Sequence, residues 1–379
     1  MPTAGPPPEV PAYFDHASAS PLRPQVIEAL AEVLKIPQAD PGRSHDEAII
    51  VRDLIEDSRR QVAHLVGATP RQLVFTSAIT ESVTSAVVAL GAGRRILAAG
   101  TERASVLDAA RRCGHLEFIE VDRHGHLDLD HLDRLLTGDP ALVCCQVANH
   151  ETGVLTDPGP VVALARSRGA AVHLDAATAT GHVDLSLGEL DADAVTVTGE
   201  MIGGPMGCAG LVVRRGRPFP HLLEGGAQER GRRPGLENLL GIVGFGVAAE
   251  ALTPHIADEA ERARRQIAVL EAAAVAVEGV IAVGDSDPTR RAPHLRCLTV
   301  EGIEAEPILL GLNRVGVSIH SGSACSSETL EPSAVLAAMG LDADRSIRIS
   351  VGWSTTDDDV ARFAAVFGPV ISDLRALRA

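Results

Sequence analysis

The chain has 379 residues and a mass of 39.5 kDa, which is long for one hydrophobic core and short for three domains, so we expect one large and one small domain. Apolar residues make up 45% of the chain, and no apolar run approaches the ~20 residues that span a bilayer, so we expect no membrane partner. The net charge of −16 argues against a nucleic-acid partner, because phosphate backbones would be repelled.

The start of the chain, Met1–Pro8, carries neither the basic flank nor the apolar core of a targeting signal, so we expect a cytoplasmic protein. The six cysteines form no C-x-x-C pair, which favours reduced thiols over disulfides or a zinc site, and we expect no metal. Only one of the 34 basic residues is a lysine, Lys35, in the predicted first helix. Chemistry that needs a lysine elsewhere in the chain is therefore excluded.

The first two thirds of the chain have an α/β pattern. Apolar residues recur at helical spacing from Val51 to Val66, which predicts an amphipathic helix that Gly67 ends. From about residue 70 to 215, short apolar runs alternate with helical periods, which is typical of a mainly parallel sheet. The predicted strands are Gln72–Thr76, Arg95–Ala98, Leu116–Val121, Ala141–Val147, Ala170–Asp175, Ala194–Thr198 and Cys208–Val213.

The last third has a different pattern, that of a small α+β domain. We predict an N-terminal arm over residues 1–20 that joins this small domain, a large α/β domain over 21–250, and the small domain over 251–379. Helical stretches flank the boundary, one from Gly235 to about residue 252 and one over 256–277. Further elements of the small domain are strands His294–Val300 and Ser346–Val351, a helix near Pro307–Val315, and a last helix capped by Thr356.

Segments that follow predicted strands are candidate ligand sites, because ligands gather beyond the carboxyl ends of strands in open α/β sheets. The turn Thr76–Ser82 opens a helix and suits a phosphate, although a plain Ser/Thr helix cap explains it equally well. Asp175 ends an apolar strand, where a carboxylate needs a cation or a donor. The glycines of Thr196–Gly207 indicate close backbone approach, or a structural turn. Cys325 lies in a small polar loop and could be a nucleophile or sulfur carrier, whereas most free cysteines are buried.

These motifs together resemble the cysteine desulfurases, which are pyridoxal-phosphate (PLP) enzymes of the class V aminotransferase group. The resemblance implies a PLP-transferase fold of type I, with a mainly parallel seven-stranded sheet in the large domain and a small α+β C-terminal domain. The matching segments span nearly the whole chain: Tyr13–Pro21, Val74–Ser77, Thr80–Ser82, His150–Val154, His173–Ala176, Gly225–Glu229 with Arg233, Gly235 and Asn238, Ser321–Cys325, Leu330–Ser333 and Ser346–Arg348.

The resemblance assigns roles to five residues in a site shared by the two subunits of a homodimer. Asp175 matches the carboxylate that pairs with the PLP ring nitrogen, and Thr80 and Thr198 match hydroxyls that contact the phosphate. Arg348 matches the guanidinium that binds the substrate α-carboxylate. Cys325 matches the loop nucleophile that takes the substrate sulfur as a persulfide.

Other family positions differ in this chain. The Schiff-base lysine of the family is Met201 here, and a thioether cannot form an imine or carry a proton. We therefore expect no covalently bound PLP, with noncovalent PLP as the alternative. The further altered positions are Glu200 and Arg103 in place of two histidines, Thr178 in place of a glutamine, His150 in place of an asparagine, and Leu236 in place of a threonine.

We consequently predict a desulfurase-like protein without PLP-dependent turnover of cysteine, which carries persulfide sulfur on Cys325 or acts as a partner in a sulfur-transfer pathway. Its own partners would be a second copy, a sulfur-acceptor protein or an active desulfurase homologue. The alternatives are an enzyme with a repurposed site in which Glu200 is a general base, and an active cysteine desulfurase. A fourth interpretation is that Cys325 and Arg348 serve only the fold.

Overall fold

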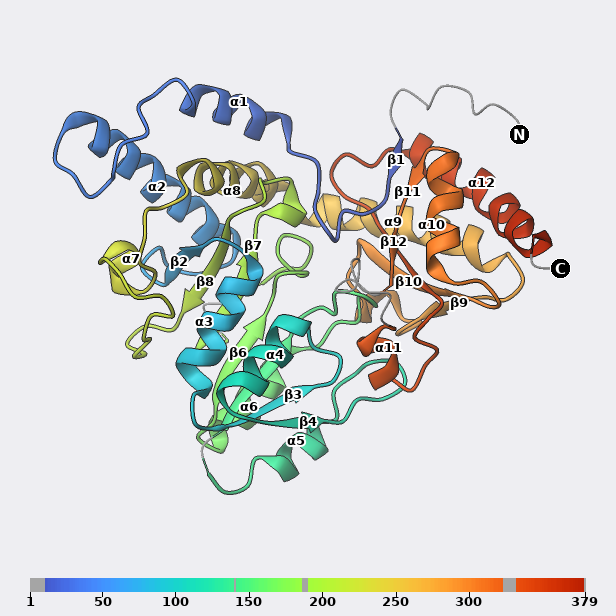
Figure 1. Ribbon diagram of the computed structural model, residues 1–379, viewed down its shortest axis with the longest axis horizontal. Helices are drawn as coiled ribbons and strands as arrows, with labels where there is room; N and C mark the ends of the chain where they lie inside the picture. Colours follow the sequence, from blue (N-terminus) through green and yellow to red (C-terminus); the bar gives the residue numbers. More distant parts are fainter. Residues whose placement is uncertain (1–10, 140, 186–189, 323–331, 378–379) are drawn as a thin grey trace.

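The computed structural model describes residues 11–139, 141–185, 190–322 and 332–377. At its centre lies a seven-stranded sheet of order β2-β8-β7-β6-β5-β3-β4 (Figure 1). Strands β7, β6, β5, β3 and β4 are parallel, whereas β8 is antiparallel to both of its neighbours. The strands are β2 (Leu73–Thr76), β3 (Arg95–Ala99), β4 (His115–Ile119), β5 (Ala141–Gln146), β6 (Ala171–Asp175), β7 (Ala194–Thr198) and β8 (Ala209–Val213).

The prediction of an α/β fold with a mainly parallel sheet is confirmed, and each of the seven predicted strands forms. The strand order places β6 in the middle of the sheet, so Asp175 lies at the centre of its carboxyl edge. Thr198 ends the neighbouring strand β7 at the same edge. The two predicted site residues are therefore brought together by the strand order, which local sequence patterns do not encode.

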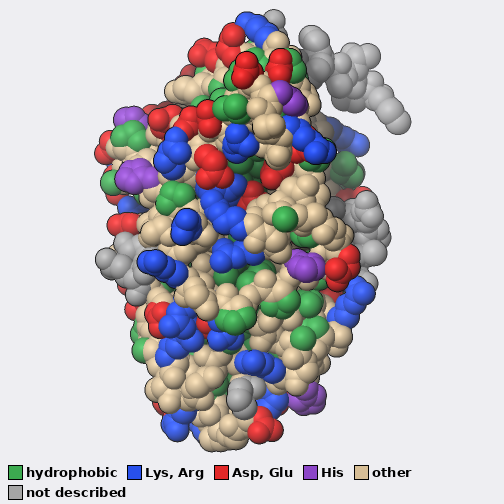
Figure 2. Space-filling view, turned by 90° about the vertical axis from the view of Figure 1, so that its left-hand side faces the viewer, with side chains coloured by type: hydrophobic (Ala, Val, Ile, Leu, Met, Phe, Trp, Pro, Cys, Tyr) green, Lys and Arg blue, Asp and Glu red, His purple; other side chains and the backbone are tan. Residues whose placement is uncertain are grey.

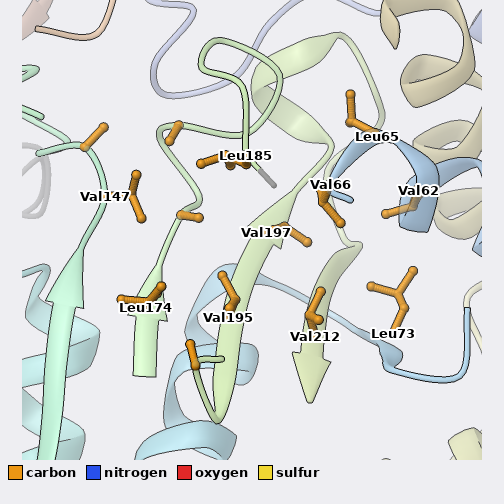
Figure 3. Packing of buried hydrophobic residues seen from close by; sticks show 14 of the residues in the cluster. Val62, Leu65, Val66, Leu73, Val147, Leu174, Leu185, Val195, Val197 and Val212 are labelled. Atoms are coloured by element: carbon orange, nitrogen blue, oxygen red, sulfur yellow. The ribbon is translucent and has the colours of Figure 1, made fainter. Parts of the chain in front are cut away.

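Except for the edge strand β4, whose burial is only partial, the strands of this sheet are buried on both faces, which explains their largely apolar sequences. Helices α2 (Asp46–Leu65), α5 (Leu129–Leu135), α6 (Pro158–Ser167) and α8 (Leu239–Leu252) contribute to the core on one face, and α3 (Ile79–Gly91) and α4 (Ala104–Cys113) to that on the other. Figure 3 shows Val62 and Leu65 of α2 on the side of this face that β7, β8 and β2 form, with Leu174 of β6 farther away.

The helices that pack beside the sheet end where their sequences indicate. Gly67 has φ +64°, a left-handed conformation that stops α2 without strain. Helix α1 (Pro24–Val33) ends before Lys35, which lies outside it because Pro37 disfavours further helix. Lys35 is exposed and forms an ion pair with Glu32 at 2.6 Å. The placement of this lysine inside the first helix was therefore wrong.

One helical stretch, Leu239–Val275, is apolar and long enough to cross a membrane by length and composition alone. Its first part is α8, which packs against α1 and α2 with most of its residues buried. A core helix passes the same test, and burial in the protein accounts for the apolar composition of α8.

The C-terminal part forms a four-stranded antiparallel sheet of order β12-β13-β10-β9. The N-terminal strand β1 pairs in parallel with β11 beside this sheet. The start of the described chain therefore lies against the C-terminal part of the molecule (Figure 1). The domain boundaries at residues 20 and 250 stay predictions. The elements here are β1 (Ala12–Tyr13), α9 (Ile256–Val275), β9 (Val280–Val283), β10 (Leu295–Val300), α10 (Ala305–Arg314), β11 (Val317–Ser318), β12 (His320–Ser321), α11 (Ala334–Ala338), β13 (Ser346–Ser350) and α12 (Asp357–Ala376). The short helix α7 (Gln228–Gly231) belongs to the other part of the molecule, where Glu229 pairs with Arg59 of α2.

Candidate functional site

The carboxylate of Asp175, at the end of the central strand, is buried and already has a cationic partner. Its Oδ2 accepts a hydrogen bond from Nε of Arg103 at 3.0 Å, and its Oδ1 accepts one from the backbone nitrogen of Ala177 at 3.0 Å. Nη2 of Arg103 also donates to Oγ1 of Thr178 at 3.2 Å. The cation that a strand-end carboxylate requires is therefore supplied from within this chain.

Arg103 reaches Asp175 because its loop is held against the end of the intervening strand β5. Arg103 is the N-cap residue of α4, in the loop that follows β3, and β5 lies between β3 and β6. Nδ2 of Asn149 donates to the carbonyl oxygen of Thr101 at 3.0 Å, and Nε2 of Gln146 donates to its Oγ1 at 3.1 Å. The sheet order and these bonds together direct Arg103 toward the end of β6.

Glu102, beside Arg103, is a buried acid. Its Oε1 accepts a hydrogen bond from the backbone nitrogen of Gln146 at 2.8 Å, while Oε2 has no partner among the described residues. Burial, followed by repulsion from Asp175, raises the pKa of Glu102 to about 8. The carboxyl group therefore holds a proton at neutral pH and can donate it.

The segment after β7 forms the neighbouring part of the site. Thr198 is fully buried, and its Oγ1 has no hydrogen-bond partner in the described part of the chain. Glu200 and Met201 lie in a short 3-10 helix, η2 (Glu200–Ile202), where Ser20 donates from its nitrogen to the carbonyl oxygen of Glu200 and from its hydroxyl to that of Met201, both at 2.8 Å. Gly203 has φ +89° and ends this turn.

The two altered side chains in this turn differ in environment. Met201 is 3% exposed and belongs to an apolar cluster that also contains Ile79, Leu107 and Ala177. Glu200 is partly buried, and burial raises its pKa although Arg103 lowers it. Position 201 thus presents a thioether within an apolar environment, and position 200 a carboxyl group close enough to Arg103 to be affected by its charge.

The predicted phosphate turn is closed by a carboxylate. Oε2 of Glu81 accepts a hydrogen bond from the backbone nitrogen of Ser77 at 2.6 Å, and its Oε1 lies 3.0 Å from Nε of Arg233. Thr80 is exposed in the first turn of α3. Leu236 is also exposed, at 62% of its surface. The amide that an anion would approach here is satisfied by the protein itself, and the phosphate role of Thr80 stays a prediction.

Arg348, on β13, is buried and binds three groups from two distant segments. Its Nη1 donates to the carbonyl oxygen of His150 at 2.9 Å, and its Nη2 donates to Oδ1 of Asp15 at 2.8 Å and to Oγ of Ser18 at 2.6 Å. Nε has no partner among the described residues. Asp15 is the carboxylate bound by this guanidinium in the structure, and the substrate-binding role of Arg348 stays a prediction.

His150 connects the two arginines electrostatically. It follows β5 and is buried, and burial, with smaller effects of Arg103 and Arg348, lowers its pKa well below the usual value. The ring is therefore neutral at physiological pH. Cys325, the predicted nucleophile, lies outside the described residues.

Sequence reasoning did not single out three buried histidines near Arg348. The rings of His182 and His294 stack with centroids 3.6 Å apart, and His16 bonds to Ser20 and Thr355 through its two ring nitrogens at 2.8 and 3.1 Å. Neither nitrogen of His294 has a hydrogen-bond partner among the described residues. No group of three or more His, Cys, Asp or Glu within those residues could hold a metal ion. The three histidines are far apart in the sequence, so no local pattern indicated that His182 and His294 would stack.

Sequence reasoning also missed Asp15 and Glu102 as functional residues. Glu102 lies in the loop that follows a predicted strand, the region where ligand groups were sought, so its place in the chain was an available signal. The role of Asp15 could not be found in this way, because 333 residues separate it from Arg348.

Comparisons with known proteins place these features in a family. The model of the family "Aminotransferase class-V" matches residues 12–363. A cysteine desulfurase of Trichormus azollae is 37% identical, with 96% of this chain and 94% of the relative covered, and cysteine desulfurase IscS 1 of Archaeoglobus fulgidus is 33% identical, with 96% and 98% covered. The chain belongs to the class-V aminotransferase family. Within this family it is similar to the cysteine desulfurases.

Solved structures agree with this assignment. The NifS-like protein of Rickettsia africae superposes with a TM-score of 0.88 at 27% identity, covering 95% of this chain and 99% of its own. The predicted family and fold, including the PLP-transferase architecture, are therefore confirmed.

The same comparisons overturn the expectation about the cofactor. We expected no covalently bound PLP, with noncovalent PLP as the alternative. However, cysteine desulfurases as a family bind PLP covalently, and the relatives reported above are named cysteine desulfurases. Nothing in the comparisons indicates that cofactor binding has been lost. The expectation of no covalently bound PLP is therefore corrected by the relatives.

The residues of the described site fit PLP in part. Asp175 and the unpartnered hydroxyl of Thr198 lie at the sheet edge where the family binds the ring nitrogen and the phosphate. Two other positions do not match: residue 201 offers a thioether, and the guanidinium of Arg103 is already bonded to Asp175. We therefore derive no chemical step through the cofactor from this structure.

Proposed function

We propose that this desulfurase-family protein does not turn over cysteine by itself, and that it serves sulfur transfer through Cys325, either as a carrier of persulfide sulfur or as the partner of an active desulfurase. The observation that carries this proposal is the environment of Met201. The side chain at the position of the family lysine is a thioether that is 3% exposed within an apolar cluster. It can neither attack a carbonyl carbon nor move a proton.

The carrier step requires only the thiol of Cys325. The thiolate attacks the outer sulfur of a persulfide donor, R–S–SH, so that the new bond forms Cys325–S–SH and the R–S⁻ thiolate leaves. No net oxidant is needed, because one sulfur–sulfur bond replaces another.

We further propose that the protein is a cytoplasmic homodimer. Two exposed apolar side chains support an interface: Met206 is 74% and Leu236 62% exposed, and the bond from Asn238 to the carbonyl oxygen of Gly207 ties their loops together.

Figure 2 shows Lys and Arg side chains gathered along the middle of one face of the molecule.

A repurposed enzyme is the second candidate, and the buried acids favour it. Glu102 has a pKa of about 8 because of burial and the charge of Asp175, and burial raises that of Glu200. Carboxyl groups with raised pKa values are suited to general acid-base catalysis near neutral pH. This candidate requires a substrate that meets Glu102 or Glu200 at the sheet edge.

The deciding experiment measures alanine and sulfide release from cysteine, with PLP and a thiol reductant added. We expect no turnover by the wild-type protein, and a gain of turnover in the double variant Met201→Lys/Arg103→His, which restores two family residues. The single variants and Cys325→Ala in the double-variant background are the controls. Mass spectrometry after incubation with a persulfide donor should show one added sulfur on Cys325.

Release of alanine by the wild-type protein alone would instead establish an active desulfurase. A protein that neither turns over cysteine nor gains sulfur on Cys325 would contradict the carrier form of the proposal. The partner form would then be tested by co-purification with a desulfurase homologue from the same cells, and failure there too would refute the proposal.

A further inference from the structure

The ion pair between Arg103 and Asp175 has a consequence for the ligands that this site accepts. The carboxylate is 4% and the guanidinium 15% exposed, and Nε lies 3.0 Å from Oδ2. In the family, the same carboxylate holds the ring nitrogen of the cofactor. In this chain, a cation is therefore already bound where the ring nitrogen would bind.

Both oxygens of Asp175 have a donor in the structure. Oδ1 is bonded to the nitrogen of Ala177 and Oδ2 to Arg103, and the bond from Arg103 to Thr178 fixes the orientation of the guanidinium. A carboxylate oxygen can accept a second hydrogen bond. A protonated ring nitrogen would then lie close to the guanidinium, however, and two like charges repel strongly in a buried site.

We propose that Arg103 is a specificity-determining residue that acts as an internal counter-ion of Asp175, lowering the affinity for ligands whose ring nitrogen binds this carboxylate. A ligand of that kind must displace the guanidinium or share the carboxylate with it. A ligand with no cationic nitrogen at that point incurs no such cost. This effect of Arg103 is confined to the Asp175 end of the site and does not depend on whether the protein turns over cysteine.

Two matched probes test this proposal. Pyridoxamine 5′-phosphate carries the ring nitrogen but no aldehyde, so its binding does not depend on the residue at position 201. Its 1-deaza analogue has carbon in place of the ring nitrogen and is otherwise the same. Dissociation constants of both are measured by titration calorimetry for the wild-type protein and for Arg103→Ala, Arg103→Lys and Arg111→Ala. Arg111 lies on the same helix, is exposed and pairs with Asp108, so it controls for loss of charge on α4.

We expect Arg103→Ala to bind pyridoxamine 5′-phosphate roughly 10- to 100-fold more tightly than the wild type, because one charge-assisted hydrogen bond no longer has to be broken. The 1-deaza analogue should change by less than about threefold. Arg103→Lys, which keeps the charge, and Arg111→Ala should both resemble the wild type.

Equal or weaker binding of pyridoxamine 5′-phosphate by Arg103→Ala would overturn the proposal, and so would an equal gain for the 1-deaza analogue, since Arg103 would then act by its size. Circular dichroism checks that each variant is folded. If Arg103→Ala does not fold, the two probes are compared on Arg103→His, which places the family's own polar residue at this position. Failure of this test leaves the cysteine assay above unaffected, because the probes contain no sulfur.

Discussion

The candidate site has two arginines that pair with carboxylates in different ways. Arg348 is 1% exposed on a strand in the middle of its sheet, and it binds groups from two segments distant in the chain. Arg103 is the N-cap of a helix, is 15% exposed, and binds groups at the end of one strand. The first arginine lies in a predicted family motif, and the second stands at a position that is predicted to differ from the family.

This difference indicates what each arginine contributes. Arg348 connects the N-terminal segment and the loop after β5 to the C-terminal sheet, so its contribution to stability should be large. Arg103 pairs with Asp175, which is predicted to bind a ligand, and is more exposed than Arg348, so it should affect binding more than folding. Substitutions at Arg348, at the buried groups beside each arginine and at Arg103 test this contrast through their effects on stability.

Arg348→Ala should lower the free energy of unfolding by about 3–5 kcal/mol, because it leaves Asp15 without its buried cation and the carbonyl oxygen of His150 without a donor. Urea denaturation at neutral pH measures the change. Arg345→Ala is the matched control: its side chain is 43% exposed and pairs with Asp342 at 3.4 Å, so the loss should stay below about 0.5 kcal/mol. Similar losses for both variants would show that Arg348 is not the structural connection inferred here.

Glu102→Gln should change how stability depends on pH. The pKa of Glu102 is raised to about 8 in the folded protein, so the folded state binds more protons than the unfolded state between about pH 4.5 and 8. Wild-type stability is therefore lost as pH rises through this window, by about 1 kcal/mol per pH unit relative to Glu102→Gln. Urea denaturation at several pH values measures it. The exposed variant Glu301→Gln is the reference and should follow the wild type. If the free energy of unfolding of Glu102→Gln also runs parallel to that of the wild type at every pH, Glu102 does not have a raised pKa.

His294→Leu, a substitution near Arg348, should change the pH dependence of stability in the opposite direction to Glu102→Gln. Burial, followed by the charge of His182, holds the pKa of His294 well below 6.5, so its contribution to stability is fully present above pH 6.5 and is lost as pH falls. The wild type should lose about 2 kcal/mol between pH 6.5 and 5 relative to His294→Leu. The exposed variant His115→Leu should retain the wild-type profile. An unchanged acid profile in His294→Leu would show that this ring is not a buried neutral histidine.

Arg103→Lys should have the smallest effect on stability. A lysine keeps the charge beside Asp175 but cannot also reach Thr178 with a planar fork, so we expect a loss of about 1 kcal/mol. Urea denaturation measures it against Arg111→Lys, an exposed change on the same helix with no expected effect. A loss as large as that of Arg348→Ala would remove the contrast between the two arginines.

Much of the fold could be predicted from local patterns. Most strands of the large sheet were found because largely apolar runs are typical of strands buried on both faces, whereas the edge strand β4 is only partly buried. The last helix was found from its cap, since Thr356 and Asp359 form a capping box at its start. The short strands β1, β9, β11 and β12 were not predicted, because two to four residues carry too little pattern to identify a strand.

The sequence by itself determined the family and the order of the strands along the chain, because these depend on residue types and on local periodicity. Only the tertiary structure decided which charges meet. The pairs Arg103 with Asp175 and Arg348 with Asp15 join residues 72 and 333 positions apart. Such contacts follow from strand order and packing, which bring distant loops to one sheet edge, and burial there makes each unpaired charge costly enough to require a partner.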